Sequence, residues 1–125
     1  MTPQTHGARA KDEDRRSLAE RLAAAETLLL DSAMGTELDR RGLTTVLPLW
    51  SALGPLERPD LVEAIHLDNL RSGADILTTA TFRTTGRTLA KAGLEPGGAE
   101  RLDRVAAGAA MRARADSGRL EALVA

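Results

Sequence analysis

The chain has 125 residues, which is enough for a single small domain. Its 17 lysines and arginines nearly cancel its 18 aspartates and glutamates, so it lacks the positive charge that binding to nucleic acid or an anionic membrane would need. It contains no cysteine and only two histidines, which excludes disulfides and any zinc site built from this chain alone.

The first sixteen residues are polar and mixed in charge, and they contain Pro3 and Gly7. This composition predicts a disordered lead over residues 1–16. Residues 1–11 lack the apolar stretch of a secretory signal, and no apolar run approaches the roughly 20 residues of a membrane span. We therefore expect a cytoplasmic protein.

The first helix and the first strand follow directly. Ser17 and Glu20 match a capping box, and apolar residues recur at helical spacing, so a short helix is expected from Ser17 to about Glu26. The apolar run 27–30 then ends abruptly in polar residues that begin with Asp31. This pattern predicts a buried strand with Asp31 at its end.

A long connection comes next. Residues 36–41 can form a helical turn closed by Gly42, and residues 43–59, with three prolines, indicate an extended loop that carries Trp50. A connection of this length is often functional.

The remainder alternates helices with strands. Proline in a first turn, glycine after a last turn, and β-branched runs predict these elements: helix 59–72, strand 74–82, helix 84–92, helix 99–115 and strand 120–125. Such a βαβ series builds a parallel sheet, which needs both faces covered. Two and a fraction strands with their helices do not complete that arrangement.

Four blocks resemble the homocysteine-binding domain of the homocysteine S-methyltransferases. They agree with it in both order and spacing, over residues 27–94 and more weakly to the last strand. The blocks are Leu30-Asp31-Ser32-Ala33-Met34-Gly35-Thr36-Glu37-Leu38, Pro48-Leu49-Trp50-Ser51-Ala52, His66 with Ser72-Gly73-Ala74-Asp75, and Thr78-Thr79-Ala80-Thr81-Phe82.

The resemblance implies an α/β fold that is the first part of a TIM (β/α)8 barrel. It would comprise about two and a half βα units preceded by an N-terminal helix. Such barrels typically need about 250 residues, so residues 17–125 are expected to be a partial homocysteine-binding domain, truncated after the start of its third strand.

The resemblance also implies an activity for the parent protein. The family transfers a methyl group from an activated donor to the sulfur of homocysteine, producing methionine. Its zinc, held by cysteines from later strands, makes the thiolate that attacks the methyl carbon. This chain would supply only the amino-acid-binding part, and alone it is expected to be inactive. The implied partners are homocysteine, a methyl donor and the missing carboxyl-terminal part of the barrel.

The substrate-binding residues carried over from the family lie in the matched blocks. Asp31 is expected to accept the substrate ammonium at the carboxyl end of the first strand, where active sites of this fold lie. The backbone of Ser32 is placed beside the substrate, and Thr79 and Thr81 are placed in the pocket lining. Trp50 lies in the loop that can cover the pocket.

Three positions depart from the family pattern and leave the methyl donor open. They are Asn69, Ala80 and Arg83, where the family often has a tyrosine-like residue, asparagine, and glutamine or tyrosine.

Simpler interpretations apply to the same residues. An aspartate after an apolar run is usually a turn or cap residue, but the four-block match outweighs that interpretation for Asp31. Trp50 is equally well explained as a packing anchor. His66, at the edge of a buried helix stripe, is expected to be a satisfied structural histidine. Residues 33–36 lack the glycine spacing and lysine of a phosphate loop.

Two other hypotheses stay open at this point. The chain is alternatively a non-catalytic remnant that acts through association with a partner chain, or part of an unrelated barrel enzyme.

Three arginines near the end of the chain are expected to lie on the solvated face of the last helix and at its exit. They are Arg112, Arg114 and Arg119.

Overall fold

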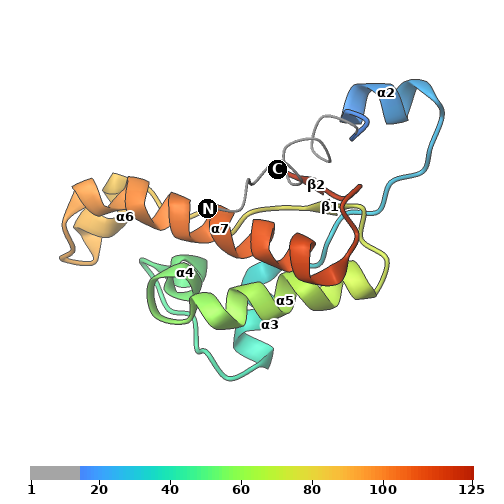
Figure 1. Cartoon of the computed structure of the whole chain (residues 1–125). Helices are drawn as coiled ribbons and strands as arrows, with labels where there is room; N and C mark the ends of the chain where they lie inside the picture. Colours follow the sequence, from blue (N-terminus) through green and yellow to red (C-terminus); the bar gives the residue numbers. More distant parts are fainter. Residues whose placement is uncertain (1–14) are drawn as a thin grey trace, which may run out of the picture.

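The computed structural model describes residues 15–125, so most of the expected disordered lead lies outside the described residues. The fold of these residues is mostly helical, with two short strands in the second half of the chain (Figure 1). In order, the elements are α2 (Leu18–Ala23), α3 (Met34–Arg40), the 3₁₀ turn η1 (Trp50–Ala52), α4 (Leu53–Glu57), α5 (Pro59–Arg71), β1 (Ile76–Leu77), α6 (Gly86–Lys91), the 3₁₀ turn η2 (Pro96–Gly98), α7 (Ala99–Ser117) and β2 (Leu123–Val124).

The strands are parallel, as the sequence predicted. β1 pairs with β2 so that Ile76 lies opposite Leu123, and on its other side Ile76 forms a parallel bridge with Leu30. Each crossover between neighbouring strands carries a helix, α5 in the first and α7 in the second. The fold class is therefore α/β, with three parallel segments in chain order.

The strands are much shorter than predicted. Of the expected strand 74–82 only Ile76 and Leu77 are regular, and the expected strand 27–30 makes a single bridge. The prediction that the first strand is buried was wrong, because Leu29 and Leu30 are 56% and 68% exposed. Neither leucine belongs to a core cluster of the described residues. Strand length and burial in a parallel sheet depend on covering layers that a short segment cannot specify by itself.

The core lies where α5 and α7 pack side by side (Figure 1). The face of α7 toward α5 is built from alanines, which let the two helix backbones approach closely, and four of them are fully buried: Ala106, Ala109, Ala110 and Ala113. Gly54 of α4 is also a close-approach position. A Cβ atom there would lie 2.9 Å from side-chain atoms of both Leu38 and Val62. These contacts join α3, α4 and α5 into one core.

Helix ends follow the expected signals more closely than strands do. Ser17 and Glu20 form the predicted capping box, and Gly73 and Gly118 lie at positive φ (107° and 73°) just after α5 and α7. α2 nevertheless ends at Ala23 rather than near Glu26. The helical φ angles cannot continue through Ala25, whose φ is 58°.

The long connection is more ordered than predicted. The expected helical turn 36–41 begins two residues earlier, at Met34. The expected extended loop 43–59 instead contains η1 and α4. No helix of residues 15–125 is both long enough and apolar enough to cross a membrane.

Two of the three late arginines are structural, which corrects the expectation of a solvated face. Arg114 is buried and donates to the carbonyl of Ala122 over 3.2 Å. Arg119 donates to the carbonyl of Ala74 (2.7 Å) and to the carboxylate of Asp75 (3.0 Å). Arg112 is exposed, as expected, and pairs with Glu63.

Asp75 connects all three strand segments, and we call this set of contacts the Asp75 tie. Its carboxylate accepts the backbone N–H of Leu29 (2.9 Å) and the guanidinium of Arg119, while its carbonyl accepts the N–H of Leu123 (2.9 Å). The Leu29 N–H and then the Arg119 charge hold the pKa of Asp75 below its usual value. The ion pair between Asp75 and Arg119 therefore lies beside the paired strand segments.

Candidate functional site

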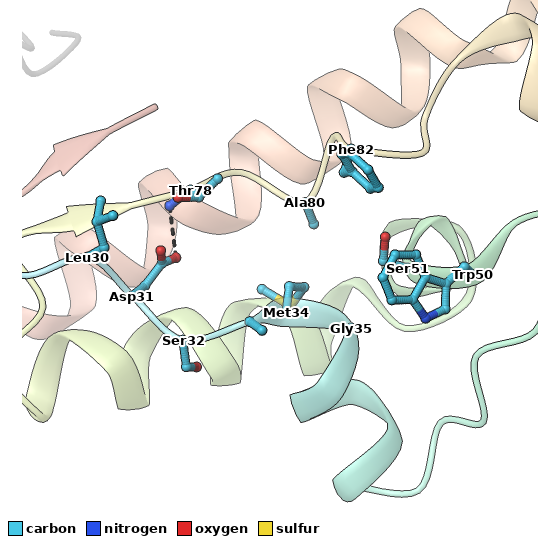
Figure 2. Close-up of a pocket in the computed structure, with 11 residues that line it drawn as sticks. Leu30, Asp31, Ser32, Met34, Gly35, Trp50, Ser51, Thr78, Ala80 and Phe82 are labelled. Atoms are coloured by element: carbon cyan, nitrogen blue, oxygen red, sulfur yellow. Dashed lines mark hydrogen bonds between the residues drawn. The ribbon is translucent and has the colours of Figure 1, made fainter.

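A pocket of about 480 Å³ opens at the carboxyl ends of the first strand segment and β1, and we call it the Asp31 pocket (Figure 2). Its lining comes from the first strand end, α3, η1 and the segment after β1. The lining residues are Leu30, Asp31, Ser32, Ala33, Met34, Gly35, Trp50, Ser51, Thr78, Ala80 and Phe82.

Asp31 lies where the sequence placed it. Its N–H donates to the carbonyl of Ile76 (3.1 Å), which fixes the backbone against β1. Its Oδ2 accepts the backbone N–H of Thr78 (2.8 Å), and Figure 2 shows the carboxylate directed toward Thr78. One carboxylate oxygen is thus held by the neighbouring strand end, and its lone pairs and those of the second oxygen can accept further donors.

Ser32 lines the pocket through its backbone and is held from below by α5. Its N–H donates to Oδ1 of Asn69 (3.1 Å), and the Asn69 amide donates in turn to the carbonyl of Ile65 (3.0 Å). The Ser32 hydroxyl points away from Thr78 and Phe82 (Figure 2). The Ser32 N–H is therefore already paired in this structure, and Asn69 positions the turn that follows Asp31.

Trp50 closes one end of the pocket and is 37% exposed. Its φ of 44° is unusual for a bulky residue and stores backbone strain. Gly35 leaves room for the indole, because a Cβ atom there would lie 3.3 Å from Trp50 Cζ2. Phe82 meets the indole edge to face, with ring centroids 6.2 Å apart. Trp50 is thus both a packing residue and part of the lining.

Thr79 and Thr81 are absent from the lining of the Asp31 pocket, whereas Thr78 and Ala80 are part of it. The two threonines do share a side, as alternation predicted, since their Oγ1 atoms lie 3.0 Å apart. That shared side is not the one that lines the pocket. The structure thus brings Asp31, Ser32 and Trp50 together and leaves Thr79 and Thr81 out.

Several lining residues were not singled out from the sequence. The sequence did not predict that Thr78 and Ala80 face the pocket, because regular strand pairing stops at Leu77. The contact of Gly35 and Phe82 with Trp50 depends on the positive φ of Trp50, for which no sequence signal exists.

His66 is fully buried beneath this site, and neither ring nitrogen has a hydrogen-bond partner among the described residues. The expectation of a satisfied histidine is therefore wrong, although the expectation of burial is confirmed. Burial lowers the pKa of His66, and the nearby charge of Asp31 opposes that shift. His66 is thus held toward its neutral form.

The residues that the structure describes do not fit a zinc site. The sequence contains no cysteine, and no group of three or more His, Asp or Glu side chains within residues 15–125 could hold a metal ion.

Comparison with known proteins gives consistent matches. The family model described as homocysteine S-methyltransferase matches residues 28–125. The chain is 37% identical over 94 residues to homocysteine S-methyltransferase YbgG of Bacillus subtilis (strain 168), covering 75% of this chain and 30% of that protein. It is 43% identical over 70 residues to homocysteine S-methyltransferase of Escherichia coli (strain K12), covering 56% and 23%.

The structure is similar to a solved relative as well. The oxidized form of the homocysteine methyltransferase MmuM from Escherichia coli superposes with a TM-score of 0.75 at 34% identity, covering 88% of this chain and 40% of that one. The chain therefore spans less than half of that solved chain and 30% or less of the two curated relatives.

Proposed function

Because the chain belongs to the homocysteine S-methyltransferase family, we propose that it holds the amino-acid end of homocysteine in the Asp31 pocket. The observation that carries this proposal is the position of the Asp31 carboxylate, which lies at the carboxyl ends of two neighbouring parallel strand segments. In (β/α)8 barrels these ends form the active-site face. We accordingly assign residues 17–125 to the first two and a half βα units of such a barrel.

The parent protein would transfer a methyl group from an activated donor to the sulfur of homocysteine and release methionine. Zinc, supplied with its ligands from outside this chain, would lower the pKa of the homocysteine thiol. Homocysteine, the methyl donor and the rest of the barrel are then the partners, and the location is the cytoplasm. The names of the relatives, both homocysteine S-methyltransferases, support the proposed activity.

The contribution of this chain is positioning. The backbone N–H of Thr78 fixes Oδ2 of Asp31, so the carboxylate is oriented before the ligand arrives. The substrate ammonium would donate to Asp31, and the apolar lining, from Leu30 and Met34 to Phe82, would hold the methylene chain. Trp50 would limit how far the ligand extends. Thr79 and Thr81 would act from outside the lining, by supporting the segment that carries Thr78.

The test is binding of homocysteine to Asp31→Asn. Asparagine keeps an oxygen that can accept the Thr78 N–H but removes the charge that pairs with the ammonium. We expect the Kd for homocysteine, measured by isothermal titration calorimetry, to rise by about tenfold, as for loss of a charge-assisted hydrogen bond. Asp116→Asn, on the exposed end of α7, makes the same change away from the pocket and should leave the Kd unchanged.

A ligand without the amino group separates this role from a structural one. 4-Mercaptobutyrate should bind the unsubstituted chain more weakly than homocysteine and should be insensitive to Asp31→Asn. If both ligands weaken equally in the variant, Asp31 only supports the fold and the proposal fails.

A further inference from the structure

A second pocket, of about 340 Å³, lies next to the Asp31 pocket and collects three cationic side chains. We call it the basic pocket. It lies between the loop that leads to Trp50 and the segment from Arg83 to the end of α6, and its lining residues are Leu47, Pro48, Arg83, Arg87, Thr88 and Lys91. No carboxylate lines it.

The three cations are spaced for repulsion. Arg87 and Lys91 lie four residues apart on α6, and like charges at this spacing on a helix repel each other; Arg83 precedes the helix and lines the same pocket. Among the described residues none of the three forms an ion pair, whereas arginines elsewhere do, as Arg40 with Glu37 and Arg104 with Glu100. The fold itself supplies no counter-charge here.

Arg83 also has a donor without an acceptor. Its guanidinium carbon lies 5.7 Å from the ring centroids of both Trp50 and Phe82. These cation–π contacts involve the flat faces of the guanidinium and give its N–H groups no hydrogen-bond acceptor. Nε of Arg83 is buried and has no hydrogen-bond partner among the described residues. A buried unpaired donor is costly and commonly marks a missing ion or water.

A hydroxyl adds a further donor from the same side. Thr88 is 8% exposed, and its Oγ1 accepts a hydrogen bond from Thr85 over 3.0 Å. Its own proton is therefore left for another acceptor. Three cationic side chains and one hydroxyl thus border a small cavity whose lining has no carboxylate.

We propose that the basic pocket binds an oxyanion, a carboxylate or phosphate group carried by a small molecule. An oxyanion would accept from Thr88, and its charge would pair with the three cations Arg83, Arg87 and Lys91, which are unpaired among the described residues. The volume suits one such group and the part of the ligand attached to it. This site is separate from the ammonium site at Asp31 and does not depend on homocysteine binding there.

The experiment uses the only tryptophan as the reporter, because Arg83 lies over its ring. The chain is titrated with inorganic phosphate and, separately, with tricarballylate, at an ionic strength held constant with sodium chloride. At least one of them should change the Trp50 fluorescence in a saturable way. Saturation by phosphate alone, by tricarballylate alone, or by both identifies which oxyanion the pocket accepts.

Matched substitutions locate the site. Arg87→Gln and Lys91→Gln should each weaken binding about tenfold, since each removes a charge-assisted contact while keeping a good helix former. Arg101→Gln removes the same charge from the exposed face of α7 and should change the Kd by less than about twofold if only long-range attraction is lost. Absence of saturation with both anions, or equal weakening in all three variants, overturns the proposal.

Discussion

Three side-chain nitrogen atoms within residues 15–125 are buried without a hydrogen-bond partner. They are both ring nitrogens of His66 and Nε of Arg83. Burying such a group without a hydrogen bond costs about 1–3 kcal/mol. Arg83 is stacked against Trp50 and Phe82, and its guanidinium lines the basic pocket. His66 is fully enclosed, so the fold bears its cost.

His66→Leu should remove that cost together with a pH dependence. Because the pKa of His66 is lowered in the folded state, the unfolded chain binds the proton first as the pH falls below 6.5. The free energy of unfolding should therefore be highest above pH 6.5 and should fall below it. Urea unfolding at pH 7.5 and 5.5 should show this loss for the unsubstituted chain and not for His66→Leu, which should also be about 1 kcal/mol more stable at pH 7.5.

His66→Gln is the matched control for this experiment. It keeps a polar side chain but cannot titrate, so it should lose the pH dependence without gaining stability. An unchanged loss of stability between pH 7.5 and 5.5 in both variants would show that another group is responsible.

Among the secondary-structure elements, the short strands depend on side-chain contacts that supplement their few ladder hydrogen bonds. β1 and β2 have two residues each, and the first strand contributes one bridge. The Asp75 tie adds a carboxylate that reaches the first segment and an arginine that precedes β2. Contacts of the single residue Asp75 thereby fix how the three segments are aligned with one another.

Asp75→Asn should weaken this sheet by about 2 kcal/mol, because the amide places a donor against Arg119 and loses the charge. The pKa of Asp75 is lowered on folding, so its contribution is complete above pH 3.8 and is lost as the pH falls further. Thermal unfolding followed by circular dichroism should show the difference from the unsubstituted chain at pH 6 and a smaller difference at pH 3. Asp116→Asn should match the unsubstituted chain, and an equal effect of the two variants would contradict the role of the tie.

Element ends were predictable where one residue determines them. The Ser17 cap and the glycines after α5 and α7 depend on local backbone chemistry, and the structure has them where the sequence indicated. Strand extents were not predictable, since they depend on neighbours far along the chain. The same holds for Arg119, whose partner Asp75 is 44 residues away. Asp31 was found through a motif, whereas Thr78 was missed because the pleat ends at Leu77.

For the whole molecule, the Asp31 pocket has an apolar wall that faces solvent. Leu30 and Phe82 line it and are 68% and 74% exposed. Exposed apolar surface of this kind is common at interaction sites. It is consistent with our proposal that the rest of the barrel packs there, and it is also what a non-catalytic remnant bound to a partner chain would require.

The chain by itself should produce no methionine above background when incubated with zinc, homocysteine and S-methylmethionine. It has no cysteine to hold zinc, so nothing in it would ionise the thiol. Methionine can be quantified by mass spectrometry after overnight incubation. Turnover that requires the chain and disappears in Asp31→Ala would refute this prediction.

The Asp75 tie also has a consequence for synthesis of the protein. A ribosome makes Arg21, Leu29 and Asp75 well before Arg119, so for 44 codons the nascent chain carries this carboxylate with Arg21, 3.8 Å away in the folded protein, but without Arg119. During that interval the first two strand segments can already meet through the carboxylates of Asp75 and Asp31, which accept the N–H groups of Leu29 and Thr78. The third segment can join this pair only after Arg119 and β2 have been made, when Arg119 and the Leu123 N–H reach Asp75.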